Sequence, residues 1–158
     1  MPSPFHLAIN GYGRIGRCFL RALRESPVPR NLQVVASNEP AGLESMAYLT
    51  RFDSTHGRFP GEVETDNDEL LIDGQAIAVS HAQAPEDVDW RGIGLDLLIE
   101  ASGRYGRRPE LARFLAAGCP RLLLSHPGFS ASDVDATIVA GINEKTLAGG
   151  ERIVSAAS

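Results

Sequence analysis

Three glycines near the start of the chain have the spacing of a turn that holds a pyrophosphate. Gly11, Gly13 and Gly16 follow the apolar run 7–9 and open a stretch, 14–25, with a helical pattern. Between a strand and a helix, the first glycine makes the tight turn, the second lets the phosphates approach the backbone, and the third lets the helix pack on the strand. The free N–H groups at the helix start attract the anion. The motif alone has low specificity, so its interpretation depends on its surroundings.

Two residues inside this turn are placed so that their backbone contacts the anion. Arg14 and Ile15 lie between the second and third glycines, where N–H groups meet a pyrophosphate. The alternative is that the Arg14 side chain is solvated and that Ile15 packs under the helix. For Ile15 the two roles are compatible, because packing uses the side chain and hydrogen bonding uses the backbone.

An acidic residue follows the next predicted strand. The strand 32–37 ends in Asn38-Glu39, and Glu39 lies 23 residues after Gly16. In dinucleotide-binding folds an acidic residue near this position binds the adenosine ribose, and its charge disfavours the 2′-phosphate of NADP. Asn38 and Glu39 are therefore predicted to bind NAD. The alternative is that Glu39 is an acidic residue at a helix N-terminus, which the following Pro40 also favours.

Two later strands end in hydroxyl residues beside a turn. These ends are Ala101-Ser102-Gly103 and Ser125-His126-Pro127-Gly128. Open α/β sheets bind ligands at the carboxyl ends of their strands, so Ser102, Gly103 and Ser125 are candidate cofactor contacts. Each serine could instead form a simple turn or a helix cap. His126 has no visible acidic or nucleophilic partner, which favours a structural role.

The elements that position these residues alternate between strand and helix. This alternation predicts an α/β fold of the Rossmann type, with a doubly wound, mostly parallel sheet. In the segment 69–79, Asp73-Gly74 between two apolar runs predicts an inserted antiparallel hairpin, and residues 66–68 before it are expected to form a solvated turn. Residues 1–158 contain no repeat or linker and are predicted to form one domain. The expected strands are 7–10, 32–37, 95–100, 122–124, 136–139 and 152–155, and the expected helices are 14–25, 43–52 and 109–117.

The composition is that of an ordinary globular protein. The chain has 158 residues, of which 43% are hydrophobic and 22% charged, and its net charge is −5. This charge disfavours nucleic-acid binding, and no apolar run approaches the roughly 18 residues of a membrane span. The first six residues lack the basic and apolar segments of a signal peptide. We therefore expect a cytoplasmic protein that binds neither nucleic acid nor membrane.

The cysteines and histidines indicate no metal centre. Cys18 and Cys119 suit a reducing compartment, lack metal-ligand spacing, and are expected to be small packing residues. The four histidines are too scattered to indicate a zinc site. The sequence also has no Gly-x-Ser-x-Gly elbow and no activated cysteine at the predicted cleft. It therefore predicts a cofactor-binding unit without catalytic residues.

The sequence resembles the NAD-binding domain of the phosphorylating glyceraldehyde-3-phosphate dehydrogenase family over nearly its whole length. The resemblance implies NAD as the cofactor and a covalent mechanism. A cysteine thiolate, activated by a histidine of the C-terminal domain, attacks an aldehyde, and hydride passes to nicotinamide. In family members that act on erythrose 4-phosphate, water then hydrolyses the resulting thioester. In the family the last segment leads into this cysteine, which would be residue 159. Residues 1–158 are therefore expected to be the N-terminal part of a longer dehydrogenase and inactive alone. The resemblance is carried by AINGYGRIGR at 8–17, FDSTHGRF at 52–59, EASG at 100–103, IN at 142–143 and RIVSAAS at 152–158.

The resemblance also implies roles for individual residues. It places Arg14 and Ile15 at the pyrophosphate of NAD and Glu39 at the adenosine ribose. Ser102 and Ser125 should line the nicotinamide side of the groove.

Two further positions are assigned in the same way. Ser158 matches the serine before the nucleophile, which helps to hold the substrate. Gln83 stands where the family commonly has an arginine near the adenine, so a contact through backbone atoms is expected and a role of the side chain is left open. Family members are tetramers, and a homotetramer is expected for the full-length protein.

Some details resemble the erythrose-4-phosphate dehydrogenases within this family. They are Asn38-Glu39-Pro40-Ala41 followed by Met46-Ala47, Tyr105-Gly106, and Ser125-His126-Pro127-Gly128, where the glycolytic enzymes usually have Ser-Ala-Pro. The resemblance implies NAD-dependent oxidation of a sugar-phosphate aldehyde, D-erythrose 4-phosphate, to 4-phosphoerythronate, a step towards pyridoxal phosphate. Two alternatives stay open: a glycolytic glyceraldehyde-3-phosphate dehydrogenase, and a freestanding, non-catalytic dinucleotide-binding module.

Overall fold

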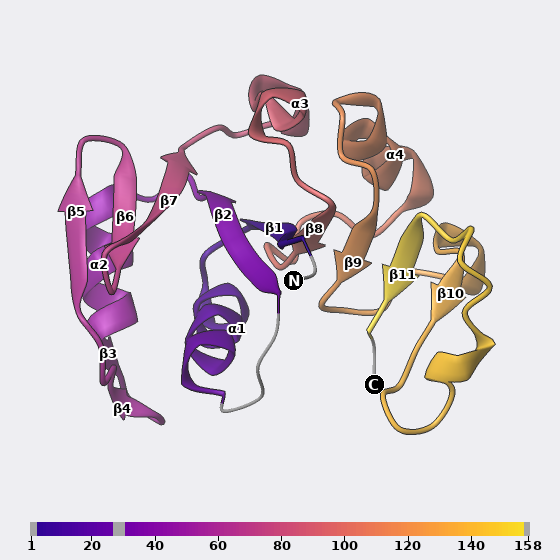
Figure 1. The fold of residues 1–158 in the computed structure, drawn as a ribbon. Coiled ribbons are helices and arrows are strands. Elements are labelled where there is room, and N and C mark those ends of the chain that lie inside the picture. The colour runs from indigo at the N-terminus through magenta and orange to yellow at the C-terminus, as the bar shows by residue number, and fades with distance from the viewer. Residues whose placement is uncertain (1–2, 27–30, 157–158) are drawn as a thin grey trace.

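A nine-stranded sheet organises the protein (Figure 1). It is seen in a computed structural model that describes residues 3–26 and 31–156. The strand order is β10-β11-β9-β8-β1-β2-β7-β6-β5, and β3 and β4 form a separate two-stranded sheet. The strands are β1 (Phe5–Asn10), β2 (Leu32–Asn38), β3 (Phe52–Asp53), β4 (Gly57–Arg58), β5 (Val63–Asp66), β6 (Glu69–Ile72), β7 (Gln75–Ser80), β8 (Leu97–Glu100), β9 (Leu122–Leu124), β10 (Ala136–Thr137) and β11 (Ile153–Ser155). The α-helices are α1 (Arg14–Glu25), α2 (Leu43–Arg51), α3 (Trp90–Ile93) and α4 (Arg108–Ala116), and the 3₁₀ helices are η1 (Pro85–Asp87), η2 (Ala131–Asp133) and η3 (Glu144–Thr146).

The central strands have the order of a Rossmann fold. Strands β7, β2, β1, β8, β9 and β11 lie side by side in this order, and each is parallel to its neighbours. Numbered along the chain, this is the doubly wound order 3-2-1-4-5-6. The winding reverses at β1, which places the ligand crevice of such a sheet at the carboxyl ends of β1 and β8. The predicted fold class is confirmed.

The antiparallel part of the sheet is larger than the sequence predicts. Strands β6 and β7 form the predicted hairpin, with Asp73 and Gly74 in the left-handed region at φ of 51° and 81°. The solvated turn expected before it is also present, with Asn67 exposed, but it joins β6 to a further strand, β5, that was not predicted. The second strand of this inserted hairpin, β7, also pairs in parallel with β2 and so continues the central sheet.

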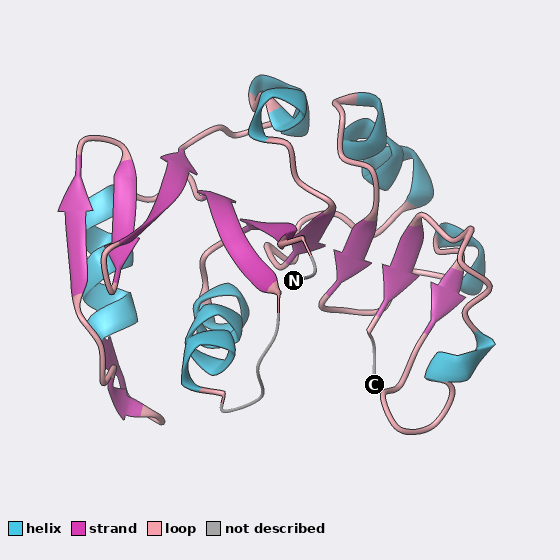
Figure 2. Ribbon diagram, in the orientation of Figure 1, coloured by secondary structure: helices cyan, strands magenta, loops and turns pink. Residues whose placement is uncertain are grey.

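Alternating side chains build one core on each face of the sheet. On β1, Leu7 and Ile9 belong to a core shared with α1 and α2, whereas Ala8 belongs to a second core shared with α3 and α4. Figure 2 shows α1 below the sheet and α3 and α4 above it. This two-sided cover is typical of parallel strands, which are apolar on both faces. Among the helices of the described residues, none has the length and apolar character needed to cross a bilayer.

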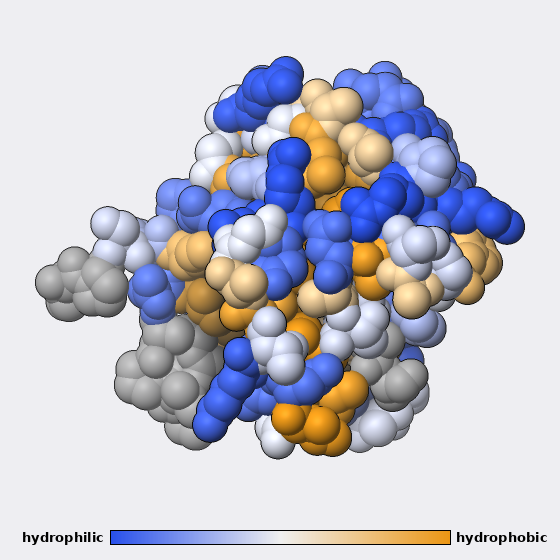
Figure 3. All heavy atoms as spheres, turned by 90° about the vertical axis from the view of Figure 1, so that its right-hand side faces the viewer, coloured by the Kyte–Doolittle hydropathy of each residue, from blue (hydrophilic) through white to orange (hydrophobic). Residues whose placement is uncertain are grey.

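The strand expected at 136–139 is shorter in the structure, where β10 ends at Thr137. The Val139 N–H donates to Asn143 Oδ1 at 2.7 Å, and Gly141 has a φ of +85°. This local turn takes the chain away from the sheet and leaves Val139 and Ile142 exposed. Figure 3, which views this end of the sheet, shows hydrophobic surface between hydrophilic residues.

The core under α4 generates a prediction about stability. Phe114 is fully buried, and its ring makes an edge contact with Tyr105 at 5.1 Å between centroids. Truncation of such a phenylalanine leaves a cavity, so we expect Phe114→Ala to lower the free energy of unfolding by about 3–5 kcal/mol. Urea denaturation measures this change. Phe129→Ala is the control, because Phe129 is 71% exposed; a loss for Phe114→Ala no larger than that of the control would contradict the core assignment.

Candidate functional site

The glycine turn joins β1 to α1 and is pressed against the end of β8. Gly11 has a φ of +93°, and its N–H donates to the Asn38 carbonyl at 2.9 Å. A Cβ atom on Gly11 would lie 2.5 Å from the Ser102 nitrogen, and one on Gly16 would overlap the Gly11 carbonyl. A Cβ atom on Gly13 would meet no described atom within 4 Å. The outer glycines are therefore required for packing, whereas Gly13 faces open space, as expected for a backbone that a ligand approaches.

The start of α1 is open to a ligand. Gly13 is the N-cap residue, and no side chain caps the helix, so the first N–H groups are available to an anion. Ile15 is 56% exposed, and the alternative in which it packs under the helix is therefore wrong. Arg14 is not freely solvated either, because its Nη1 lies 3.4 Å from Asp53 Oδ2.

Glu39 ties the end of β2 to the glycine turn. Its carboxylate accepts the N–H of Tyr12 at 2.6 Å and the N–H of Ala41 at 3.1 Å. It does not cap α2, which begins after Gly42 without a side-chain cap. A carboxylate has about four lone-pair sites, so Glu39 can still accept hydrogen bonds from a hydroxyl-bearing ligand. The geometry fits the predicted contact with the ribose.

An open groove of about 210 Å³ lies at this edge of the sheet. Its walls come from four segments, 10–13, 38–40, 82–85 and 101–105. Six of the predicted site residues line it: Gly11, Gly13, Asn38, Glu39, Gln83 and Ser102. A larger cavity of about 290 Å³ between α1 and strands β2, β6 and β7 contains none of the predicted residues. We take the smaller groove as the candidate ligand site, because it lies at the carboxyl ends of the strands, where sheets of this kind bind ligands.

A buried carboxylate lies next to the residues that line this groove. Glu100 at the end of β8 has no exposed surface. Its Oε1 accepts from Asn10 Nδ2 at 2.8 Å and from Ser102 Oγ at 2.6 Å, and its Oε2 lies 3.5 Å from His126 Nε2. The prediction that His126 has no acidic partner is therefore wrong. Glu100 was not among the predicted site residues, although an acidic residue directly after the apolar run 97–99 was a usable signal.

The polar contacts continue across the neighbouring strand ends. Asn38 Nδ2 donates to Asn10 Oδ1 at 2.9 Å, and Asn38 Oδ1 accepts from Ser80 Oγ at 2.9 Å and from the Ala82 N–H at 2.9 Å. A hydrogen-bonded row thus links β7, β2, β1 and β8. The Asn38 amide is occupied in this row, so its part in the site is to hold the strand ends in register.

The remaining predicted residues lie around the groove. Gln83 is exposed, and its carbonyl accepts the hydroxyl of Tyr105 at 3.3 Å. Gly103 has a φ of +73° in the turn after Ser102. Ser125 follows β9 outside the groove walls, and its N–H donates to the Glu100 carbonyl at 3.1 Å. Ser158 lies outside the described residues.

The glycine turn, the uncapped helix start and the carboxylate of Glu39 surround one groove, as dinucleotide binding requires. The model of one protein family, described as glyceraldehyde 3-phosphate dehydrogenase, NAD binding domain, matches residues 5–108. The chain belongs to this family. It therefore contains an NAD-binding domain of the glyceraldehyde-3-phosphate dehydrogenase type, and the resemblance drawn from its motifs is confirmed at this level.

The open space at Gly13 generates a prediction about NAD affinity. The Gly13 backbone has a φ of −76°, which alanine tolerates, so Gly13→Ala should fold normally. Its methyl group would occupy the space that the pyrophosphate approaches, and we expect NAD to bind at least about tenfold more weakly, a loss of about 1.4 kcal/mol.

Calorimetric titration with NAD measures this change. Gly42→Ala is a matched control, because Gly42 is also a helix N-cap with a φ of −70° and open space at its Cβ position. Equal NAD affinities for the two variants would show that the glycine turn does not hold the phosphates.

Proposed function

We propose that the domain serves an NAD-dependent oxidation of a sugar-phosphate aldehyde, with D-erythrose 4-phosphate as the substrate and 4-phosphoerythronate as the product. The observation that carries the dehydrogenase part is the groove between Glu39 and Ser102, with the open helix start at its centre. Bound NAD would supply the acceptor for the hydride. The residues of this chain bind and orient it.

The groove supports one orientation of the cofactor. The N–H groups of Arg14 and Ile15 would hold the pyrophosphate at the start of α1. Glu39 at the end of β2 would accept the adenosine hydroxyls. Ser102 and Ser125 lie on the other side of the glycine turn, at the ends of β8 and β9, and would line the nicotinamide side.

The choice of substrate rests on two residues that carry the resemblance, His126 and Tyr105. His126 stands where the glycolytic enzymes usually have alanine, and in this structure its ring lies against Glu100. Tyr105 lies on the groove wall, held by the Gln83 carbonyl and by the ring of Phe114. Both positions match the features that resemble erythrose-4-phosphate dehydrogenases; Tyr105 lines the groove, and His126 lies beside it against Glu100.

The nucleophile of the reaction would come from a further part of a longer protein. Cys119 is buried, and this burial raises the pKa of its thiol to about 12, so it is not a thiolate near neutral pH. Cys18 lies on α1 and does not line the groove. We propose that residues 1–158 alone bind NAD without turnover and that the longer protein is a homotetramer.

The substrate is tested by comparing two aldehydes. With the full-length protein we expect kcat/KM for D-erythrose 4-phosphate to exceed that for D-glyceraldehyde 3-phosphate by at least about tenfold, which corresponds to about 1.4 kcal/mol of transition-state stabilisation. A preference for glyceraldehyde 3-phosphate would identify a glycolytic enzyme. The absence of reduction of NAD with either aldehyde would favour a non-catalytic binding module.

Glu39 generates a prediction about cofactor choice. Its negative charge would face the 2′-phosphate of NADP, so we expect Glu39→Ser to narrow the preference for NAD over NADP at least about tenfold. Glu39→Gln keeps an acceptor for the Tyr12 N–H and loses only the charge, so it should also narrow the preference for NAD over NADP. The dissociation constants of both dinucleotides provide the measurement. Glu144→Ser, at an exposed remote site, is the control; an unchanged ratio in both Glu39 variants would exclude a ribose role.

A further inference from the structure

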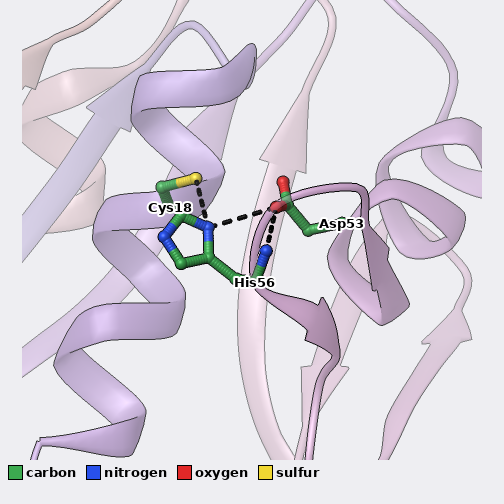
Figure 4. Close-up of side chains that lie close together, drawn as sticks. All are labelled: Cys18, Asp53 and His56. Atoms are coloured by element: carbon green, nitrogen blue, oxygen red, sulfur yellow. Dashed lines mark hydrogen bonds and ion pairs between the residues drawn. The ribbon is translucent and has the colours of Figure 1, made fainter.

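Three side chains from two parts of the chain, α1 and the β3–β4 turn, lie close together (Figure 4). Cys18 lies on α1, Asp53 ends β3, and His56 lies in the turn between β3 and β4. Cys18 Sγ is 3.9 Å from His56 Nδ1, and the same nitrogen is 3.1 Å from Asp53 Oδ1. The three candidate ligand atoms lie within 4.8 Å of one another, and none of these residues lines the nucleotide groove.

We propose that Cys18, Asp53 and His56 form a binding site for a divalent cation of the zinc class. A thiolate, an imidazole nitrogen and a carboxylate are the donors that Zn²⁺ takes in proteins. Zinc-ligand bonds of about 2.0–2.3 Å in a tetrahedron place neighbouring ligand atoms roughly 3.4–3.6 Å apart. The observed separations of 3.1 and 3.9 Å differ from these values by a few tenths of an ångström, so small side-chain rotations would complete the site.

The geometry distinguishes a metal site from a nucleophile with its base. In a Cys-His-Asp triad the imidazole uses one ring nitrogen towards the thiol and the other towards the carboxylate. Here Nδ1 of His56 faces both partners. Because the thiol and the carboxylate both face Nδ1, the imidazole ring cannot relay a proton from one to the other. The three side chains can instead bind one cation together.

Asp53 is prepared as an anionic ligand. Its side chain is only 1% exposed, and its Oδ1 accepts the N–H groups of His56 at 2.7 Å and Thr55 at 2.8 Å. The His56 N–H, followed by that of Thr55, holds the pKa of the Asp53 carboxyl well below its usual range. The other oxygen, Oδ2, is buried and has no hydrogen bond from the described residues.

Two arginines near the Asp53 carboxylate are expected to weaken the binding of a metal ion. Arg14 Nη1 and Arg17 Nη2 lie 3.4 and 3.9 Å from Asp53 Oδ2. These cations oppose a metal ion, and Arg14 Nη2 also donates to Oδ1 at 3.5 Å, but the Arg14 side chain is 44% exposed and can turn away. Binding also releases the proton of the Cys18 thiol to solvent, and the thiolate and the carboxylate together balance the charge of the cation.

The site is reachable and would join two elements. The His56 side chain is 56% exposed and Cys18 is half-buried, so a cation can enter and a water molecule can complete the coordination. The metal would connect α1 to the β3–β4 sheet, which lies outside the main sheet. The three proposed ligands lie outside the nucleotide groove, although Asp53 also pairs with Arg14 at the start of α1.

Metal titration of the purified protein tests this proposal. After treatment with a chelator, we expect one Co²⁺ per chain to bind with the charge-transfer absorption of a cobalt-thiolate bond, and Zn²⁺ to compete for the same site. Cys18→Ser should abolish this absorption. Cys18→Ser and His56→Gln should each weaken Zn²⁺ binding at least about tenfold, because loss of even a residue that only hydrogen-bonds to a metal ligand typically lowers metal affinity about 10–100-fold.

The matched controls are Cys119→Ala and His81→Gln, which remove a thiol and an imidazole elsewhere in the chain. Both should keep the absorption and the Zn²⁺ affinity. The variants of the site should fold normally, because Cys18 is half-buried and His56 is exposed, and circular dichroism checks this. No cobalt-thiolate absorption in the unmodified protein, or an equal Zn²⁺ affinity in Cys18→Ser, would overturn the proposal.

Discussion

The burial of one carboxylate, that of Glu100, constrains the arrangement of the whole binding edge. A charge without contact to solvent is stable only when hydrogen bonds and opposite charges replace water. Here Asn10 and Ser102 donate to one oxygen of the carboxylate, and His126 Nε2 lies 3.5 Å from the other oxygen, which has no hydrogen bond from the described residues. These three residues belong to the ends of β1, β8 and β9, so satisfying Glu100 requires these three strand ends to lie at fixed positions.

The nucleotide groove follows from this constraint. Gly11 can lie against Ser102 only because it has no side chain, and Ser102 is held by Glu100. On the other side of the turn, Glu39 accepts the Tyr12 N–H and so connects the end of β2 to the same loop. The open start of α1 lies between two carboxylates. Glu100 is buried and structural, whereas Glu39 lines the groove and is available to a ligand.

Asp53 connects the second polar centre of the domain to the first. Its carboxylate pairs with Arg14 at the start of α1 and lies against His56 on the other side. The helix whose uncapped start lies at the groove is thus linked through Arg14 and Asp53 to the cluster that contains Cys18.

The sequence by itself determined the fold class, the glycine turn, the Asp73-Gly74 hairpin and the acidic residue after β2. Each is a local pattern, since strand and helix periodicity, turn chemistry and motif spacing are properties of neighbouring residues. Only the tertiary structure decided which distant side chains meet, because strand order and helix docking bring together residues that no spacing rule connects. These meetings are Glu100 with His126, Asn10 with Asn38, and Cys18 with Asp53 and His56.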